Sequence, residues 1–220
     1  MTTYTGAVFN NGPVSRLLDL AVACRRDSAN AALEDELARF CRTVRNSPET
    51  DWAMPVATVS ALLDLLSDQL ESGKPPATPI GFSEKLAEAA GDLPGPEFLR
   101  LLSGLLRLQE RESLPDFDEL PMAAWEAVLK FGRIAEFWWW VDSGEYEDFD
   151  EGVREGVASE HPNRCHQDMS ALAAQVQEAL LFFPTSQARG AGLVEVIPWA
   201  SKPVLRAILD AVHVHFEEQH

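Results

Sequence analysis

Hydrophobic residues recur along most of the chain at spacings of three and four, which place side chains on one face of an α-helix. The clearest run, with Val59 and Leu63 at its centre, predicts a helix from about Pro55 to Ser72. Three further stripes predict helices that face a core. They are Phe98, Leu101, Leu102 and Leu105; Met169, Leu172, Ala173, Val176 and Leu180; and Leu205, Ile208, Leu209, Val212 and Phe216.

Weaker patterns predict five more helices, which brings the expected total to about nine. Their ranges are Val14–Arg26, Ala29–Arg45, Ser83–Ala90, Pro121–Val141 and Phe149–Ala158. Only Leu193–Ile197 alternates with β-branched residues as a strand does, and Pro198 ends it at once. The pattern therefore predicts an all-α globular bundle with short connections and little or no β-structure.

Residues 1–220 are expected to form a single α-helical domain, with 73–81, rich in proline and glycine, as the place for any subdivision. No apolar run approaches the roughly 20 residues of a membrane helix. The first residues have neither the basic start nor the apolar core of a secretory signal, so we expect a cytoplasmic protein. The three cysteines are too few for a disulfide framework and are expected to be buried thiols.

The chain is strongly acidic, with 35 acidic and 18 basic residues and a formal net charge of −17. Such a charge repels phosphate backbones and anionic membranes, so we expect no nucleic-acid or membrane partner. Residues 109–161 hold fifteen acids and four bases, which accounts for eleven of the seventeen net charges. The charge is therefore concentrated in about a quarter of the chain.

The densest acidic stretch, Asp142–Glu160, has eight acids and one base, Arg154. It is either a solvated segment that keeps the protein soluble or a docking surface for a basic partner. Nearby aromatic residues favour docking, because such side chains anchor protein interfaces. The expected partner-binding residues are Phe137, Trp140, Glu145, Tyr146, Asp148, Asp150, Glu151 and Glu155.

Phe137 and Trp140 stand out by their position on the predicted helix Pro121–Val141. At 100° per residue they fall on the same face as Glu126, Lys130 and Glu136, which is polar. Leaving two large aromatic side chains in water is unfavourable, so something should cover them. The cover is either another part of the chain, such as the acidic segment folding back, or a partner protein.

No catalytic motif is present, and the candidates for metal binding are weak. His161, Cys165, His166 and Asp168 lie close in sequence but lack the paired spacings of a zinc site. On a helix, His213 and His215 point about 160° apart and do not converge. We therefore expect no metal, no cofactor and no catalytic residue identifiable from the sequence.

These observations favour a binding protein over an enzyme. We expect it to bind a protein with a basic surface, as a stoichiometric inhibitor or immunity protein of a basic toxin or nuclease. Two alternatives stay open. One is an enzyme whose site combines carboxylates with His161 or His166, which a deep pocket beside them would favour. The other is a helical scaffold or chaperone.

Overall fold

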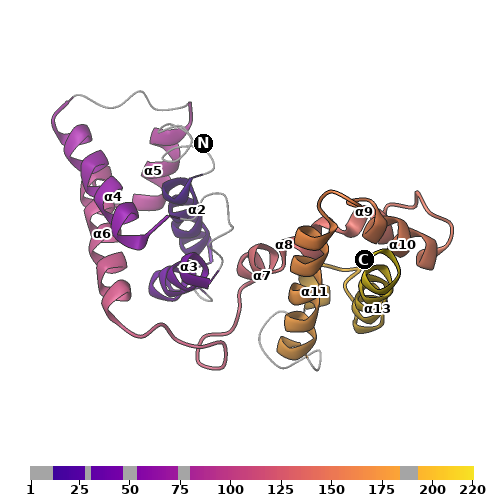
Figure 1. Ribbon diagram of the computed structural model, residues 1–220. Coiled ribbons are helices and arrows are strands. Elements are labelled where there is room, and N and C mark those ends of the chain that lie inside the picture. Colours follow the sequence, from indigo (N-terminus) through magenta and orange to yellow (C-terminus); the bar gives the residue numbers. More distant parts are fainter. Residues whose placement is uncertain (1–11, 28–30, 47–53, 74–79, 184–192) are drawn as a thin grey trace. The chain divides into compact units, whose positions relative to one another are not determined.

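The computed structural model describes residues 12–27, 31–46, 54–73, 80–183 and 193–220, and all regular secondary structure in these ranges is helical (Figure 1). They contain twelve helices, nine of them seven residues or longer, and no strand. The predicted all-α fold is confirmed. No helix in these ranges is long and apolar enough to cross a membrane.

The chain divides into two compact units, Met1–Leu120 and Pro121–His220. The boundary lies at Leu120 and not at 73–81, the place given above for any subdivision; residues 73, 80 and 81 lie inside the first unit, and 74–79 are outside the described residues. That the two units together form a single domain stays a prediction.

The described part of the first unit contains five helices. They are α2 (Pro13–Arg26), α3 (Leu33–Asn46), α4 (Val56–Glu71), α5 (Phe82–Ala90) and α6 (Gly95–Arg111). α4 packs along α6, while α2 contacts α3 and α5. These helices agree with the predicted ranges to within a few residues; the predicted start of α3, Ala29, lies outside the described residues.

The buried face of α6 differs from the predicted stripe. It consists of Phe98, Leu99, Leu102 and Leu106, whereas Leu101, predicted to face the core, is 44% exposed. The rotation of α6 is fixed by its contact with α4, where buried Ser103 donates a hydrogen bond of 3.0 Å to the carbonyl oxygen of Ser60. The side of α6 that carries Ser103 therefore faces α4, and Leu101 faces outward.

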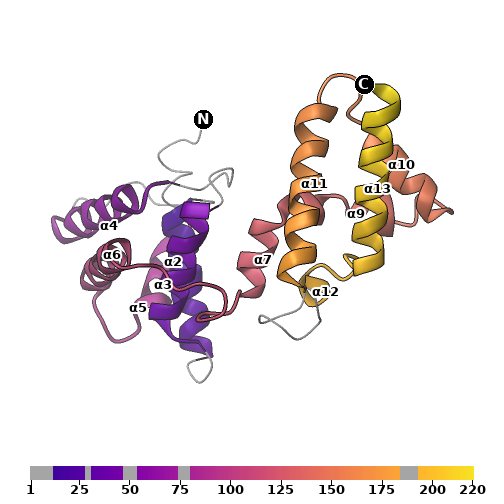
Figure 2. The ribbon, with the colours of Figure 1, turned by 60° about the horizontal axis from the view of Figure 1, so that its bottom comes forward.

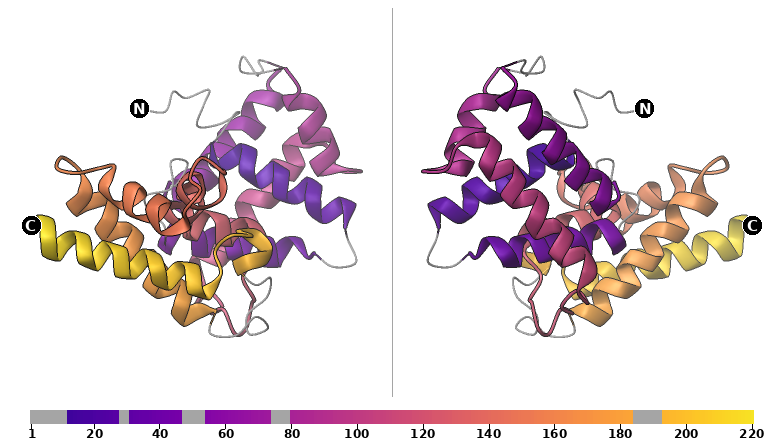
Figure 3. Two further views of the ribbon diagram at one scale, coloured as in Figure 1. Left: turned by 90° about the vertical axis from the view of Figure 1, so that its right-hand side faces the viewer. Right: turned by 90° about the vertical axis from the view of Figure 1, so that its left-hand side faces the viewer.

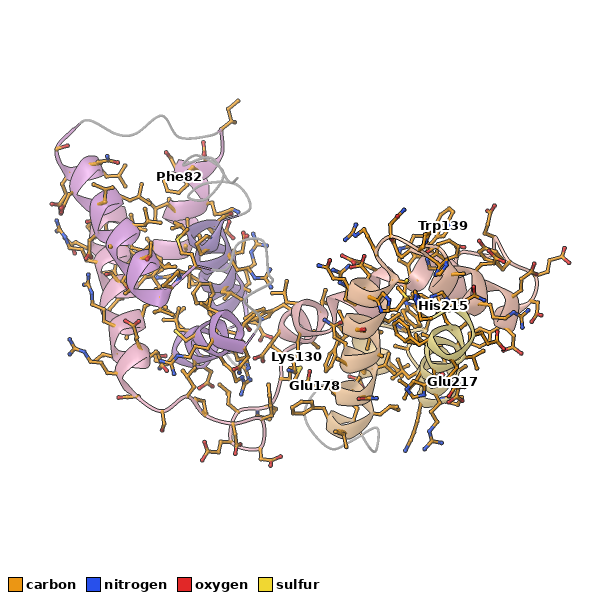
Figure 4. All side chains as sticks on the ribbon, in the orientation of Figure 1. Phe82, Lys130, Trp139, Glu178, His215 and Glu217 are labelled. Atoms are coloured by element: carbon orange, nitrogen blue, oxygen red, sulfur yellow. The ribbon has the colours of Figure 1, made fainter. Side chains whose placement is uncertain are left out.

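The described part of the second unit contains seven helices. They are α7 (Ala124–Lys130), α8 (Gly132–Glu136), α9 (Trp138–Asp142), α10 (Phe149–Ala158), α11 (Cys165–Phe182), α12 (Leu193–Val196) and α13 (Lys202–Gln219). α11 and α13 lie side by side and antiparallel (Figures 2 and 3). α10 packs against α13 and α9, and α8 against α11. Lys130 of α7 and Glu178 of α11 form an ion pair of 2.6 Å (Figure 4).

The single helix predicted for Pro121–Val141 is wrong, because the chain breaks it into α7, α8 and α9. Phe131, with φ −110° and ψ 39°, separates the first two, and Phe137, with ψ −3°, separates the last two. Both phenylalanine side chains are buried. Their burial sets the course of the backbone here, so counting 100° per residue along this range does not give the true faces.

The alternating segment Leu193–Ile197 also differs from expectation, since Leu193–Val196 is the short helix α12. The backbone N–H of Ile197 donates to the carbonyl oxygen of Leu193 at 2.7 Å, which closes one helical turn. β-Branched residues favour strands only where a neighbouring strand can pair with them. The described residues contain no such strand.

Candidate functional site

The acidic segment of the second unit consists of Asp142 at the end of α9, the turn that follows it and helix α10. Asp148 precedes α10, and its carboxylate accepts a hydrogen bond of 3.1 Å from the backbone N–H of Asp150. Asp150 and Glu151 lie in the first turn, where negative charge is favourable for a helix. The predicted range Phe149–Ala158 matches α10 at both ends.

Seven carboxylates of this segment are exposed to solvent: Asp142, Glu145, Glu147, Asp148, Asp150, Glu151 and Glu155. None of them forms an ion pair with a described residue. In the first unit, by contrast, Arg100 holds Asp68 at 2.9 Å and Glu71 at 2.5 Å. The acidic segment thus presents carboxylates that no basic side chain of the described residues holds in an ion pair.

Two of the expected partner-binding residues are covered by the protein itself. Phe137 is only 5% exposed, and Trp140 is half-buried. The cover is α10, whose Gly156 lies so close that an added Cβ would be 2.6 Å from both rings. Of the two alternatives, the structure shows the acidic segment folding back. Phe137 is a core residue in this structure.

Trp138 and Trp139 are each 47% exposed and pack edge to face at 5.6 Å between ring centroids, and Phe149 is 36% exposed. At 100° per residue along an unbroken helix, Trp138 would fall opposite Glu126, on the apolar face, but the helix is broken at Phe137. One feature of the sequence could have indicated exposure. Three consecutive tryptophans cannot all lie on one face of a helix.

Tyr146 contacts Trp140 and also lies near carboxylates of the acidic segment. Its ring contacts that of Trp140, with 5.7 Å between centroids. Burial raises the pKa of its hydroxyl, and the charges of Glu155, Glu145 and Glu151 raise it further. The tyrosine hydroxyl therefore stays protonated at neutral pH. Its O–H group can donate a hydrogen bond, and it lies close enough to Glu145, Glu151 and Glu155 to be affected by their negative charge.

A pocket of about 200 Å³ lies between α8, α9, α10 and α11. Its polar wall includes Asp168, which is buried and bound by Arg164 at 3.0 Å and Arg133 at 3.2 Å. Neither His161 nor His166 lines it. The pocket is smaller than the roughly 300–1,000 Å³ usual for ligand sites, and the buried carboxylate of Asp168 in its wall is already paired with two arginines. It does not have the features expected of the alternative enzyme site.

Four side chains from two stretches that are far apart in sequence meet where α11 begins and α13 ends. They are His161, Cys165, His215 and His220, and one donor atom of each lies within 4.8 Å of the others. The sequence argument considered only neighbouring residues and so missed this cluster. It correctly separated His213 from His215, since only His215 takes part. His166 lies beside the cluster, with its ring 4.1 Å from that of His220.

Two histidines of this cluster, His215 and His220, are in surroundings that favour the neutral form. Burial lowers the pKa of His215, and the neighbouring His161 and His166 lower it further. The pKa of His220 is lowered by desolvation and by the same neighbours together with His215. Neutral imidazole has a nitrogen lone pair that can accept a proton or bind a metal ion.

The second unit is thus an all-α unit with an unpaired acidic surface, two exposed tryptophans and a separate cluster of histidines and a cysteine. No known protein family, no curated protein and no solved structure matches the chain.

Proposed function

We propose that the protein binds another protein that has a basic surface, through the acidic segment and the exposed tryptophans of the second unit. In this proposal it acts in the cytoplasm as a stoichiometric inhibitor or immunity protein of a basic toxin or nuclease. The observation that carries the proposal is the combination of seven exposed, unpaired carboxylates with Trp138 and Trp139 beside them in the sequence. A segment that only keeps the protein soluble has no need of exposed tryptophans.

The electrostatic part of the proposal concerns the rate of association. A dense negative surface attracts a cationic partner over a distance and raises its on-rate by about 10- to 1,000-fold at low ionic strength. Carboxylates that are already held by arginine produce little net field, whereas those of Asp142–Glu155 form no ion pair with described residues. The active-site surfaces of enzymes that act on nucleic acids are cationic, and they suit such a surface.

The aromatic part concerns the lifetime of the complex. Tryptophan is among the residues most enriched at interface hot spots, because it buries a large area and loses little conformational entropy. Trp138 and Trp139 are held edge to face, so their orientation is partly fixed before binding. We therefore assign the anchoring role to this pair in place of Phe137.

The test compares the wild type with two charge-reversal variants. The first, Asp148→Lys, Asp150→Lys and Glu151→Lys, changes the acidic segment. The control, Glu84→Lys, Asp92→Lys and Glu97→Lys, changes the net charge equally in the first unit, at three exposed acids. Each set includes two acids from the first turn of a helix. The first set also removes the cap that Asp148 provides, so circular dichroism is used to check that α10 persists.

The partner is isolated by affinity capture, and its association with each variant is measured by surface plasmon resonance at low and high salt. We expect the first variant to lower the on-rate by about tenfold or more at low salt, and the control by less than about twofold. Replacing Trp138 and Trp139 by Ala should mainly raise the off-rate. Equal on-rates for both charge variants, or no dependence on salt, would contradict the proposal.

A further inference from the structure

We propose that His161, Cys165, His215 and His220 form a binding site for one zinc ion. His161 lies in the turn before α11, Cys165 is the first residue of α11, and His215 and His220 lie at the end of α13. The inference does not depend on the proposed partner. It also replaces the sequence-based expectation that no metal is bound, because that expectation assumed that these side chains do not converge.

The distances within the cluster are close to those of a tetrahedral zinc site. The Sγ atom of Cys165 lies 3.7 Å from Nδ1 of His161 and 3.1 Å from Nε2 of His220. With Zn–S near 2.3 Å and Zn–N near 2.0–2.1 Å, tetrahedral geometry separates sulfur from nitrogen by about 3.5 Å and two nitrogens by about 3.3 Å. The largest separation of 4.8 Å therefore has to shorten by only about 1.5 Å.

The buried ring of His215 has a nitrogen atom without a hydrogen-bond partner among the described residues. The side chain is 8% exposed, and its Nε2 atom makes no hydrogen bond with a described residue. Buried polar atoms without a partner are rare in native proteins, and each calls for an explanation such as an ion. His215, labelled on α13 in Figure 4, is buried, whereas His213, two residues earlier, is exposed. A zinc ion held by the cluster would give the buried ring its missing partner.

The four donor atoms, one sulfur and three nitrogens, indicate which metal the site would bind. Thiolate sulfur and imidazole nitrogen suit zinc, whereas calcium and magnesium require oxygen ligands, and no carboxylate belongs to the cluster. Four protein ligands complete a tetrahedron and leave no open position for water or substrate. The site is therefore structural. The ion would hold the start of α11 to the end of α13.

The test uses the full chain, freed of metal with a chelator and kept reduced with a phosphine. Co²⁺ is added as a spectroscopic probe, and Zn²⁺ is then titrated in competition. We expect one equivalent of Co²⁺ to give the intense visible bands of a tetrahedral site and a thiolate-to-cobalt charge-transfer band, and one equivalent of Zn²⁺ to remove both. This experiment needs no substitution, so its outcome does not depend on a variant that folds.

Variants then assign the ligands. Cys165→Ser should abolish the charge-transfer band, and His215→Ala should weaken zinc binding by at least about tenfold. His213→Ala is the matched control, because it removes the same side chain from the same helix outside the cluster, and it should bind zinc as the wild type does. Circular dichroism of each metal-free variant checks that the helices persist. Absence of the charge-transfer band in the wild type, or equal weakening by His213→Ala and His215→Ala, would overturn the assignment.

Discussion

Neighbouring aromatic residues of the second unit have opposite surroundings, and two substitutions can separate their roles. Phe137 is 5% exposed and Trp139 is 47% exposed. We expect Phe137→Ala to lower the free energy of unfolding by about 3–5 kcal/mol, because it leaves a cavity in the core. Trp139→Ala should lower it by less than about 1 kcal/mol. Urea denaturation followed by circular dichroism measures both, and similar losses would show that Trp139 is also part of the core.

Cys41 is a residue whose chemistry is suppressed by its place in the core. It is fully buried, and burial raises the pKa of its thiol to about 12, with Arg45 opposing the shift and Glu110 adding to it. A raised pKa means less thiolate, so at pH 8 about one thiol in ten thousand is ionised. We expect iodoacetamide to leave Cys41 unmodified in the native protein and to label it in denaturant, as followed by peptide mass spectrometry. Equal labelling rates in both states would contradict its burial.

At the scale of elements, the contact between α10 and α9 depends on two glycines of α10. A Cβ on Gly152 would lie 2.1 Å from the carbonyl oxygen of Trp140, and a Cβ on Gly156 would meet both Phe137 and Trp140. Four residues apart, the glycines lie on one face of α10 and let its backbone approach the aromatic residues. α10 can therefore pack this closely against Phe137 and Trp140 because neither glycine has a side chain.

We expect Gly156→Ala to lower the free energy of unfolding by about 1–3 kcal/mol, since the added methyl group overpacks this contact. Gly104→Ala in α6 is the control, because a Cβ there meets nothing within 4 Å. The control should raise stability by about 0.4–1 kcal/mol, through the lower entropy of the unfolded chain. Thermal denaturation measures both; a Gly156→Ala variant as stable as the control would show that α10 is not held closely.

The elements also show how far the sequence could predict the fold. Helices with long, regular stripes, such as α4 and α13, were predicted well, because their periodicity records the face that they bury. α7, α8 and α9 were not, since buried Phe131 and Phe137 interrupt the helix through contacts that are remote in sequence. The acidic charge of the candidate site was visible in the sequence. Three consecutive tryptophans indicate that at least one is exposed, but which of them are exposed depends on how separate helices meet. The histidine–cysteine cluster depends on the same contacts and was not visible in the sequence.

At the scale of the whole molecule, the distribution of tryptophan gives a way to observe one unit alone. Five of the six tryptophans lie in Pro121–His220, whereas helices of both units contribute to circular dichroism. Each unit has its own buried core, so we expect two thermal transitions by circular dichroism. Tryptophan fluorescence should follow the one that belongs to the second unit.

We expect Zn²⁺ at about 100 times its dissociation constant to stabilise the second unit by about 2.7 kcal/mol. For a unit of this size, that raises the midpoint of the fluorescence transition by about 10 °C or more. A chelator should reverse the rise, and the other transition should not move. A single transition that shifts in both signals would instead support the single domain that the sequence predicts.

The antiparallel pair α11 and α13 is connected through the chain at one end, and the four donor atoms gather at the other. An ion bound by these atoms would link the start of α11 to the end of α13, so the two helices would be joined at both ends. A pair of helices joined at only one end separates first at the other end, and the ion would prevent this. Closing a loop of about sixty residues, from His161 to His220, removes unfolded-chain entropy worth on the order of 4 kcal/mol in the polymer model used for cross-links. Zinc would then stabilise the second unit as a reversible disulfide does. The metal concentration, and not the redox potential, would determine the fraction of molecules that are cross-linked.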